Sequence, residues 1–377
     1  MATKFSPPTE PRLHTIDAVW LLSGARDLRH TTLVDLDLRE VTLDWAALHV
    51  DTTTLFIGCR LPLDEEIALR RRGADFLHAP TDLPYRPLRR SLYSCEELTA
   101  GPADDSYDLR IYRHFAASRN DCNLRESLWQ RLHDFSMDEG IRRLLQFDAT
   151  GMTRRRGVGF MGGHGVARTS ADFHRSVRTA KLLAEAGYFV ISGGGPGIME
   201  AANLGAYLAG HSDADLDWAL EQLAAAPGYT DPGYLDAARA VRERFPEGGE
   251  SLAIPTWFYG HEPSNLFASY VAKYFSNSIR EDTLLAIALH GIVYAPGSAG
   301  TTQEIFMDAA QNHYVTFGFV SPMVFLGRHR YAAETPLYAT LQQLAAGRTY
   351  AEYLALTDEP GEVVAFIQNH PPRPPAS

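Results

Sequence analysis

Residues 296–304, which read Pro-Gly-Ser-Ala-Gly-Thr-Thr-Gln-Glu, combine groups that can bind an anion with an acid that can act beside it. They follow an apolar run at 291–295 and precede further apolar residues, a pattern that predicts a strand, a tight loop and a helix. The first N–H groups of a helix have no partner within the helix and lie at the positive end of its dipole. Glycine lets the backbone approach a phosphate closely, and Thr301 and Thr302 add hydroxyl donors.

The acid is Glu304, one helical turn beyond the loop. A carboxylate that faced the phosphate would repel it, so we expect Glu304 to face a neighbouring part of the ligand. The alternative is an ordinary acidic residue near a helix start, where the dipole favours negative charge.

Two more glycine-rich loops follow predicted strands, at 162–165 and 193–197. Loops after the strands of an open parallel sheet meet at its carboxyl edge, where ligands bind. Three such loops favour a phosphorylated ligand, although each could be a tight turn that needs glycine. The predicted phosphate- or nucleotide-binding residues are Gly162, Gly163, Gly194, Gly195, Gly197, Gly297, Ser298, Gly300, Thr301 and Thr302.

Other residues near these loops have two interpretations each. Glu200 and Asn203 follow the second loop and could contact the ligand or pack within the protein. The aromatic cluster 257–262 could stack on a base or belong to the core. Neither the dinucleotide-binding fingerprint nor a Walker A motif fits the three loops.

From residue 157 onward, strand and helix patterns alternate, which predicts an α/β Rossmann-like parallel sheet with helices on both faces. Residues 211–250, acidic and alanine-rich, are predicted to form a helical insertion, and 267–275 a helix. The predicted domains are 1–150, 151–370 and a tail at 371–377.

Residues 1–150 are predicted to form a smaller α+β domain, to which no motif assigns a role. Alternating apolar and polar residues between 33 and 59 predict strands, and the five-residue spacing of Leu33, Leu38 and Leu43 also allows a short β-solenoid. Residues 110–147 have a helical pattern, with an apolar stripe at Leu124, Leu128, Leu132 and Phe135.

Composition narrows the functional classes. The 377 residues carry a net charge of −11, which argues against a general binder of nucleic acid or acidic membranes. The three cysteines, Cys59, Cys95 and Cys122, have no spacing typical of a disulfide framework or zinc site. No apolar stretch approaches the ~20 residues of a membrane span, so we expect a cytoplasmic protein. Nothing in the sequence resembles a cluster of metal ligands, so we expect no metal site.

Residues 193–200 and 296–304 together resemble the LOG ("lonely guy") family, formerly labelled lysine decarboxylase, over roughly residues 155–370. The family motif P-G-G-x-G-T-x-x-E is matched at Pro296, Gly297, Gly300, Thr301 and Glu304 and departs at Ser298. The resemblance implies hydrolysis of the N-glycosidic bond of nucleoside 5′-monophosphates to free base and ribose 5-phosphate. It also implies no cofactor and a homodimer or higher homo-oligomer, and the chain length resembles the longer bacterial type.

The resemblance further implies a catalytic arginine on the helix before the motif strand, for which Arg280 is the candidate. It lies one position further from the strand than in the family, a rotation of about 100° on a helix. A shifted helix or a local bulge would bring Arg280 to the site; otherwise it is a surface residue paired with Glu281 or Asp282.

The expected chemistry places Glu304 beside the ribose, where it stabilises oxocarbenium character and directs water. Two rival functions use the same loops: a nucleotide-binding sensor or carrier without turnover, and a transferase of the ribosyl phosphate.

Overall fold

The computed structural model describes residues 12–13, 24, 26–102, 104–120 and 123–374. They form two compact units: the described residues of 91–121 and 137–377 belong to one, and those of 6–90 and 122–136 to the other. The predicted boundary at residue 150 therefore does not divide the units. Segment 91–120 belongs to the larger unit because Asp108 is buried there, where it accepts hydrogen bonds from Trp257 Nε1 and Lys273 Nζ, each at 2.8 Å.

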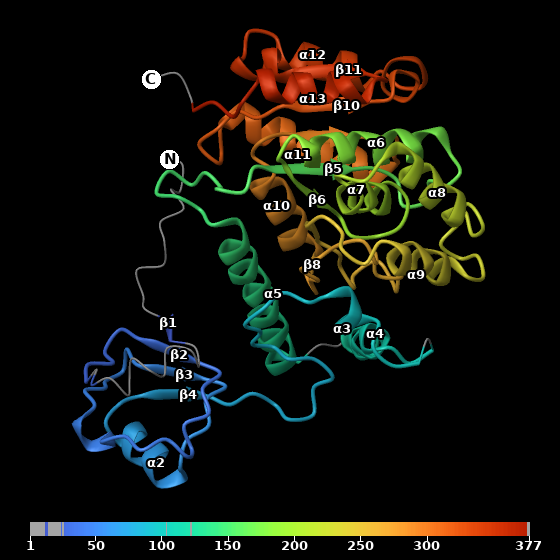
Figure 1. The fold of residues 1–377 in the computed structure, drawn as a ribbon. Coiled ribbons are helices and arrows are strands. Elements are labelled where there is room, and N and C mark those ends of the chain that lie inside the picture. The colour runs from blue at the N-terminus through green and yellow to red at the C-terminus, as the bar shows by residue number, and fades with distance from the viewer. Residues whose placement is uncertain (1–11, 14–23, 25, 103, 121–122, 375–377) are drawn as a thin grey trace. The chain divides into compact units, whose positions relative to one another are not determined.

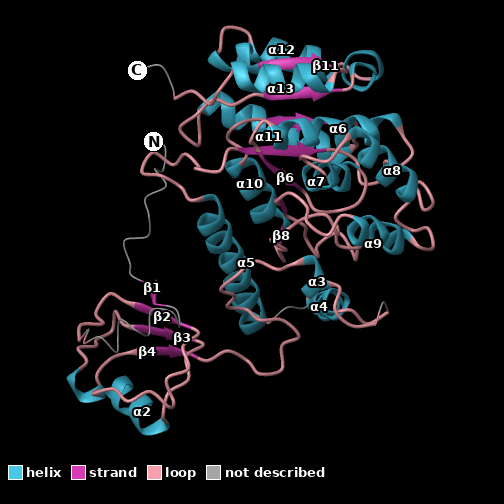
Figure 2. Ribbon diagram, viewed as in Figure 1, coloured by secondary structure: helices cyan, strands magenta, loops and turns pink. Residues whose placement is uncertain are grey.

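The described residues of the larger unit contain a seven-stranded parallel sheet of order β11-β10-β9-β5-β6-β7-β8, which confirms the Rossmann-like α/β prediction (Figures 1 and 2). The chain builds outward from β5 in one direction and then in the other, so the order reverses between β5 and β9. The strands are β5 (Gly157–Met161), β6 (Phe189–Ser192), β7 (Ser251–Ala253), β8 (Tyr270–Val271), β9 (Ile292–Tyr294), β10 (Met323–Leu326) and β11 (Leu354–Thr357).

Helices cover both faces of this sheet. Buried residues of α6, α7 and α13 join Val158, Val190 and Val293 in one core, whereas Tyr294 points to the other face and donates to Asp308 of α11 at 2.8 Å. The helices of this unit are α3 (Cys95–Leu98), α4 (Tyr107–Ser118), α6 (Ala171–Glu185), α7 (Ile198–Tyr207), α8 (Asp213–Leu223), α9 (Tyr234–Arg244), α10 (Asn277–Ile287), α11 (Ala299–Tyr314), α12 (Leu337–Ala345) and α13 (Pro360–Asn369).

Glycine in the central strand lets α10 lie close to the sheet. Val158 and Phe160 point into the core described above, while Gly157 and Gly159 point the other way, as alternation along a strand requires. A Cβ at Gly157 would lie 2.8 Å from the carbonyl oxygen of Ile287, and one at Gly159 would lie 3.0 Å from Cβ of Ala288. Any larger residue at Gly157 would therefore push away the helix that carries Arg280.

Two sequence predictions of helical structure are wrong. Residues 267–275 contain the short strand β8, paired with β7, instead of a helix; nearly all of its apolar residues are buried, so periodicity could not separate helix from strand. In α5 (Leu124–Leu145), which contributes to both units, the predicted stripe is not the buried one: Leu124 is 87% exposed, and Trp129 and Met137 are fully buried. The buried face includes His133 and Asp134, which a hydrophobic pattern assigns to the surface.

The smaller unit has four described strands, all parallel and in chain order: β1 (Arg12–Leu13), β2 (Thr32–Val34), β3 (Leu55–Ile57) and β4 (Asp75–Leu77). The helix α2 (Leu63–Arg71) joins the last two. Leu33 and Leu38 are buried in the core of this unit. The strands follow one another at the spacing of their paired residues, Thr32 with Leu55 and Leu55 with Asp75, and not at the five-residue spacing of the leucines. Among the described helices of the chain, none has the length and apolar character needed to cross a membrane.

Candidate functional site

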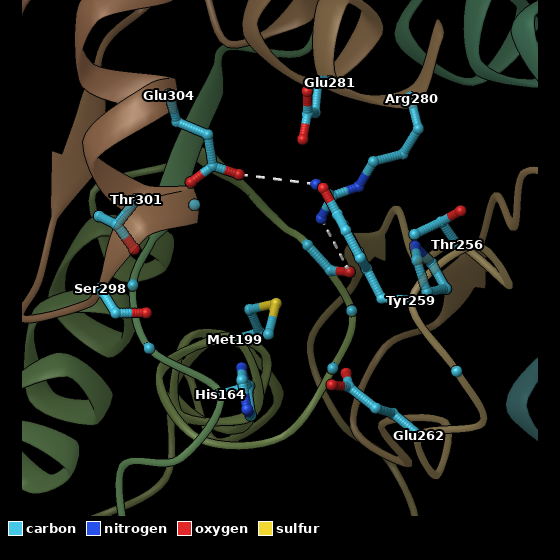
Figure 3. A pocket seen from close by; sticks show the side chains of 18 of the residues that line it. His164, Met199, Thr256, Tyr259, Glu262, Arg280, Glu281, Ser298, Thr301 and Glu304 are labelled. Carbon is cyan, nitrogen blue, oxygen red and sulfur yellow. Dashed lines mark hydrogen bonds and ion pairs between the residues drawn. The ribbon is translucent and has the colours of Figure 1, made fainter. Parts of the chain in front are cut away.

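The three glycine-rich loops meet at the carboxyl edge of the sheet, where the strand order reverses, as expected for a ligand site. Gly163 N donates to Pro296 O at 3.0 Å, and Ile198 N donates to Gly163 O at 3.1 Å, so the loop after β5 is tied to both others. Together they line a cavity of about 640 Å³ (Figure 3). The sequence-predicted residues that line it are Gly162, Gly163, Gly194, Gly195, Arg280, Ser298, Gly300, Thr301 and Glu304.

Some predicted glycines serve loop packing instead. Gly197 and Gly297 lie outside the described residues that line the cavity. A Cβ at Gly197 would collide with the carbonyl oxygen of Gly163, and one at Gly297 would collide with Thr301 Oγ1. Gly197 also has φ +67°, a conformation that favours glycine. For Gly197 and Gly297, therefore, the structure supports the alternative that the glycine is needed for a tight turn.

The start of α11 presents an open surface to the cavity. The helix begins at Ala299, and a Cβ at Gly300 would meet no described atom within 4 Å. Thr302 lies outside the lining and donates to Ser298 O at 3.1 Å. The exposed N–H groups of this first turn can therefore reach an anion in the cavity.

Arg280 reaches Glu304 in spite of the extra residue in its spacing. Helix α10 ends at Ile287, and a turn with Gly291 at φ +133° leads from it into β9. Arg280 Nη1 lies 3.5 Å from Glu304 Oε1, and both side chains are almost buried. Arg280 Nε also donates to Ile254 O at 2.7 Å, and Nη2 to Gly193 O at 3.3 Å.

Gly193 makes this position of the arginine possible. A Cβ at residue 193 would collide with Arg280 Nη2 and lie 2.6 Å from Met199 Sδ. The second glycine-rich loop therefore seats the guanidinium as well as lining the cavity.

The surroundings of Glu304 suit proton transfer near neutral pH. Burial raises the pKa of Glu304, the Arg280 guanidinium lowers it, and the Glu281 carboxylate raises it, to about 7 overall. Both protonation states are then populated at pH 7, which favours a group that must accept and donate a proton.

Sequence reasoning missed the clamp around Glu281. This residue follows Arg280, lines the cavity and is 6% exposed. Asn277 Nδ2 donates to its Oε1 at 2.6 Å, and Gln303 Nε2 donates to its Oε2 at 2.8 Å. The alternative pairing of Arg280 with Glu281 or Asp282 is absent among the ion pairs of the described residues, where Glu304 is the partner.

A second ion pair in the cavity wall was also missed. Lys273 lines the cavity, and its ammonium donates to Asp108 Oδ2 at 2.8 Å. Burial raises the pKa of Asp108, but Lys273 and His261 outweigh it and hold that pKa at about 2. No sequence signal connects residues this far apart along the chain. The aromatic cluster divides here: Trp257 is fully buried, whereas Tyr259 and His261 line the cavity.

Glu200 and Asn203 lie in the core, outside the described lining residues. Glu200 accepts from Arg168 Nε and from Tyr234 Oη, each at 2.8 Å, which attaches the insertion to α7. Asn203 bonds Ser192 Oγ at 2.6 Å and the side chain of Asn265 at 2.8 Å. We therefore leave both out of the proposed site.

No group of three or more His, Cys, Asp or Glu residues in the described parts of the chain is arranged to hold a metal ion. Of the cysteines, Cys59 and Cys95 are buried and free, and Cys122 lies outside the described residues.

Residues 155–212 match the family model described as the SLOG cluster4 family. This segment contains the first two glycine-rich loops, and the match confirms the resemblance at the level of the Rossmann-like SLOG/LOG superfamily. No curated protein sequence matches the chain.

Among solved structures, the molybdenum cofactor carrier protein of Chlamydomonas reinhardtii is similar at 16% identity and a TM-score of 0.37, over 57% of this chain and 98% of that one. The molybdenum cofactor binding protein of Rippkaea orientalis is similar at 15% identity and 0.36, over 57% and 97%. DNA processing protein A of Streptococcus pneumoniae is similar at 14% identity and 0.32, over 59% and 62%. The fold described above rests on the sheet topology, not on these likenesses.

Proposed function

We propose that this chain, whose residues 155–212 match the SLOG cluster4 family, hydrolyses the N-glycosidic bond of nucleoside 5′-monophosphates to free base and ribose 5-phosphate. The observation that carries the proposal is the pair of Arg280 and Glu304, 3.5 Å apart, inside a cavity that also holds the open start of α11. A cationic group and a titrating acid thus lie beside a seat for an anion.

In this proposal the phosphate binds at the first turn of α11, with Ser298, Gly300 and Thr301 around it and the loops after β5 and β6 opposite. The ribose then extends toward Glu304, which lies more than one turn further along the same helix. Arg280 balances the charge of the carboxylate and keeps it facing the sugar.

The reaction breaks the C1′–N bond, whose electron pair leaves with the base. Positive charge develops at C1′, and the Glu304 carboxylate stabilises it and accepts a proton from the attacking water. The water oxygen forms the new bond to C1′, and the base takes up a proton. No other reactant is needed.

The test is to incubate the full chain with a panel of purine and pyrimidine nucleoside monophosphates and to measure free base and ribose 5-phosphate. Glu304→Gln keeps the size of the side chain and should reduce the rate by about 100-fold or more, the usual contribution of a positioned acid–base group. Unchanged release of base by this variant would refute the mechanism.

One observation supports a second candidate, a nucleotide-binding sensor or carrier without turnover. Two nitrogen atoms of Arg280 donate hydrogen bonds to the backbone carbonyls of Gly193 and Ile254, so this side chain also has a structural role in holding the two segments together. Thermal stabilisation by nucleotides without release of base would favour this function, and a ribosylated acceptor among the products would favour a transferase. The homodimer and the cytoplasmic location remain proposals that gel filtration and cell fractionation can test.

A further inference from the structure

We propose that Glu281 binds the two ribose hydroxyls of the ligand and makes the cavity selective for ribose phosphates over 2-deoxyribose phosphates. This inference rests on the proposed function, because it assumes a phosphorylated sugar seated at the three loops. The family motif does not include Glu281, and its role is inferred from the contacts around it.

Both carboxylate oxygens of Glu281 are held in place by amides from two helices. Asn277, at the start of α10, donates to Oε1 at 2.6 Å, and Gln303, in α11, donates to Oε2 at 2.8 Å. A carboxylate oxygen can accept a second hydrogen bond. The Tyr259 hydroxyl, which accepts from Asn277 Nδ2 at 2.9 Å, also hydrogen-bonds this carboxylate. The clamp therefore fixes the plane of the carboxylate, and a ligand hydroxyl either takes a remaining acceptor position or replaces the tyrosine hydroxyl.

The carboxylate faces the same space as the catalytic pair. Figure 3 shows Glu281 pointing from α10 toward Glu304 and the guanidinium of Arg280, and all three residues line the cavity. Glu281 is 6% exposed, so most of its side chain is removed from solvent, and a hydrogen bond to a charged group is stronger than one between neutral groups.

The charge of this clamp selects the group it can bind. An ionised carboxylate only accepts hydrogen bonds, so it repels a phosphate and favours a neighbouring pair of hydroxyls. The vicinal 2′- and 3′-hydroxyls of ribose offer two donors for its two oxygens. The phosphate then belongs at the other end of the sugar, at the start of α11.

Gln303 connects this seat to the chemistry. It precedes Glu304 in α11, so the residue that holds Glu281 also sits next to the acid. A diol bound at Glu281 would place the sugar between the clamp and Glu304, with C1′ next to the hydroxyl on C2′.

The experiment measures calorimetric binding of ribose 5-phosphate and 2-deoxyribose 5-phosphate to the full chain. Wild type should bind ribose 5-phosphate about tenfold or more tighter, since a hydrogen bond to a charged group is lost with the 2-hydroxyl. Glu281→Gln should bring the ratio of the affinities for the two sugar phosphates near one without lowering the affinity for inorganic phosphate. Gln303→Met, which removes one amide of the clamp but no charge, should lower the ratio as well.

The matched control is Asp282→Asn, which removes the next carboxylate of α10 but lies outside the described lining of the cavity and should keep the wild-type ratio. Equal wild-type affinity for the two sugar phosphates would overturn the inference, as would an unchanged ratio in a folded Glu281→Gln protein. Absence of binding by either sugar phosphate would overturn it too.

The two proposals can fail separately. A wild-type preference for ribose 5-phosphate that Glu281→Gln removes, without any release of base from nucleotides, would support this inference and refute the hydrolase. Release of base at equal rates from GMP and dGMP, with no effect of Glu281→Gln on the ratio of the two rates, would support the hydrolase and refute this inference.

Discussion

Glu304 should make the protein less stable as the pH rises from 4.5 to about 7. Its pKa is about 7 in the folded protein, against 4.5 for an ordinary glutamate, chiefly because the side chain is buried. Below pH 4.5 the carboxyl group is protonated whether the chain is folded or unfolded. Between pH 4.5 and 7 the unfolded chain releases this proton first, so the free energy of unfolding falls, and above pH 7 the full loss remains.

The difference of about 2.5 pKa units corresponds to about 3 kcal/mol. Glu304→Gln removes the titration while keeping the shape of the side chain. It should therefore be more stable than wild type at pH 8 by about 3 kcal/mol, a figure that already includes the attraction to Arg280, and should differ little in its pH dependence below pH 4.5.

The assay is thermal unfolding of wild type and Glu304→Gln across pH 4 to 9, with the difference between the two proteins as the readout. Asp308, whose pKa burial also raises to about 7, contributes to both proteins and cancels in the difference. At pH 8 the variant should melt higher by about 6–12 °C, given that 1 kcal/mol shifts the melting temperature of a large domain by about 2–4 °C. Melting curves that keep the same separation at every pH would refute the reasoning.

Three further predictions follow from contacts of the site. Asp108→Ala should destabilise the protein by about 3–5 kcal/mol in urea unfolding, because it leaves Lys273 buried without its counter-charge; the double variant with Lys273→Met should recover much of this loss, and no recovery would contradict it. Gly193→Ala should displace the guanidinium of Arg280 and reduce release of base at least tenfold with little change in overall folding by circular dichroism; wild-type activity would show that the close packing is not needed. Arg168→Met should loosen the insertion from α7, because the buried carboxylate of Glu200 loses its bidentate partner. Limited proteolysis should then cut the insertion faster than in wild type, and an unchanged rate would contradict this role of Arg168.

The sequence allowed the strand–loop–helix units to be predicted because their signals are local. The glycine-rich loops after β5, β6 and β9 fall where expected, and the predicted Glu304 and Arg280 meet in one cavity. The arginine could not be assigned from spacing alone, because its place in the site depends on contacts with Gly193, Ile254 and Glu304, which lie far from it in the sequence.

The missed parts depend on contacts between distant residues. Asp108 and Lys273 look like surface charges in the sequence, and only the fold shows that they neutralise each other in the cavity wall. Glu281 entered the sequence analysis only as an alternative partner of a surface Arg280, because a one-dimensional pattern cannot show that Asn277 and Gln303 approach it from two helices.

The division of the chain has a practical consequence for anyone who wishes to dissect it. The path passes from one unit to the other at about residues 90, 121 and 136, so no single cleavage separates them. A fragment that began at residue 151 would lose α4, and with it the carboxylate that neutralises Lys273. The sheet that carries the three loops is therefore not a free-standing module, and grafting it onto another protein would require residues 91–121 as a second piece.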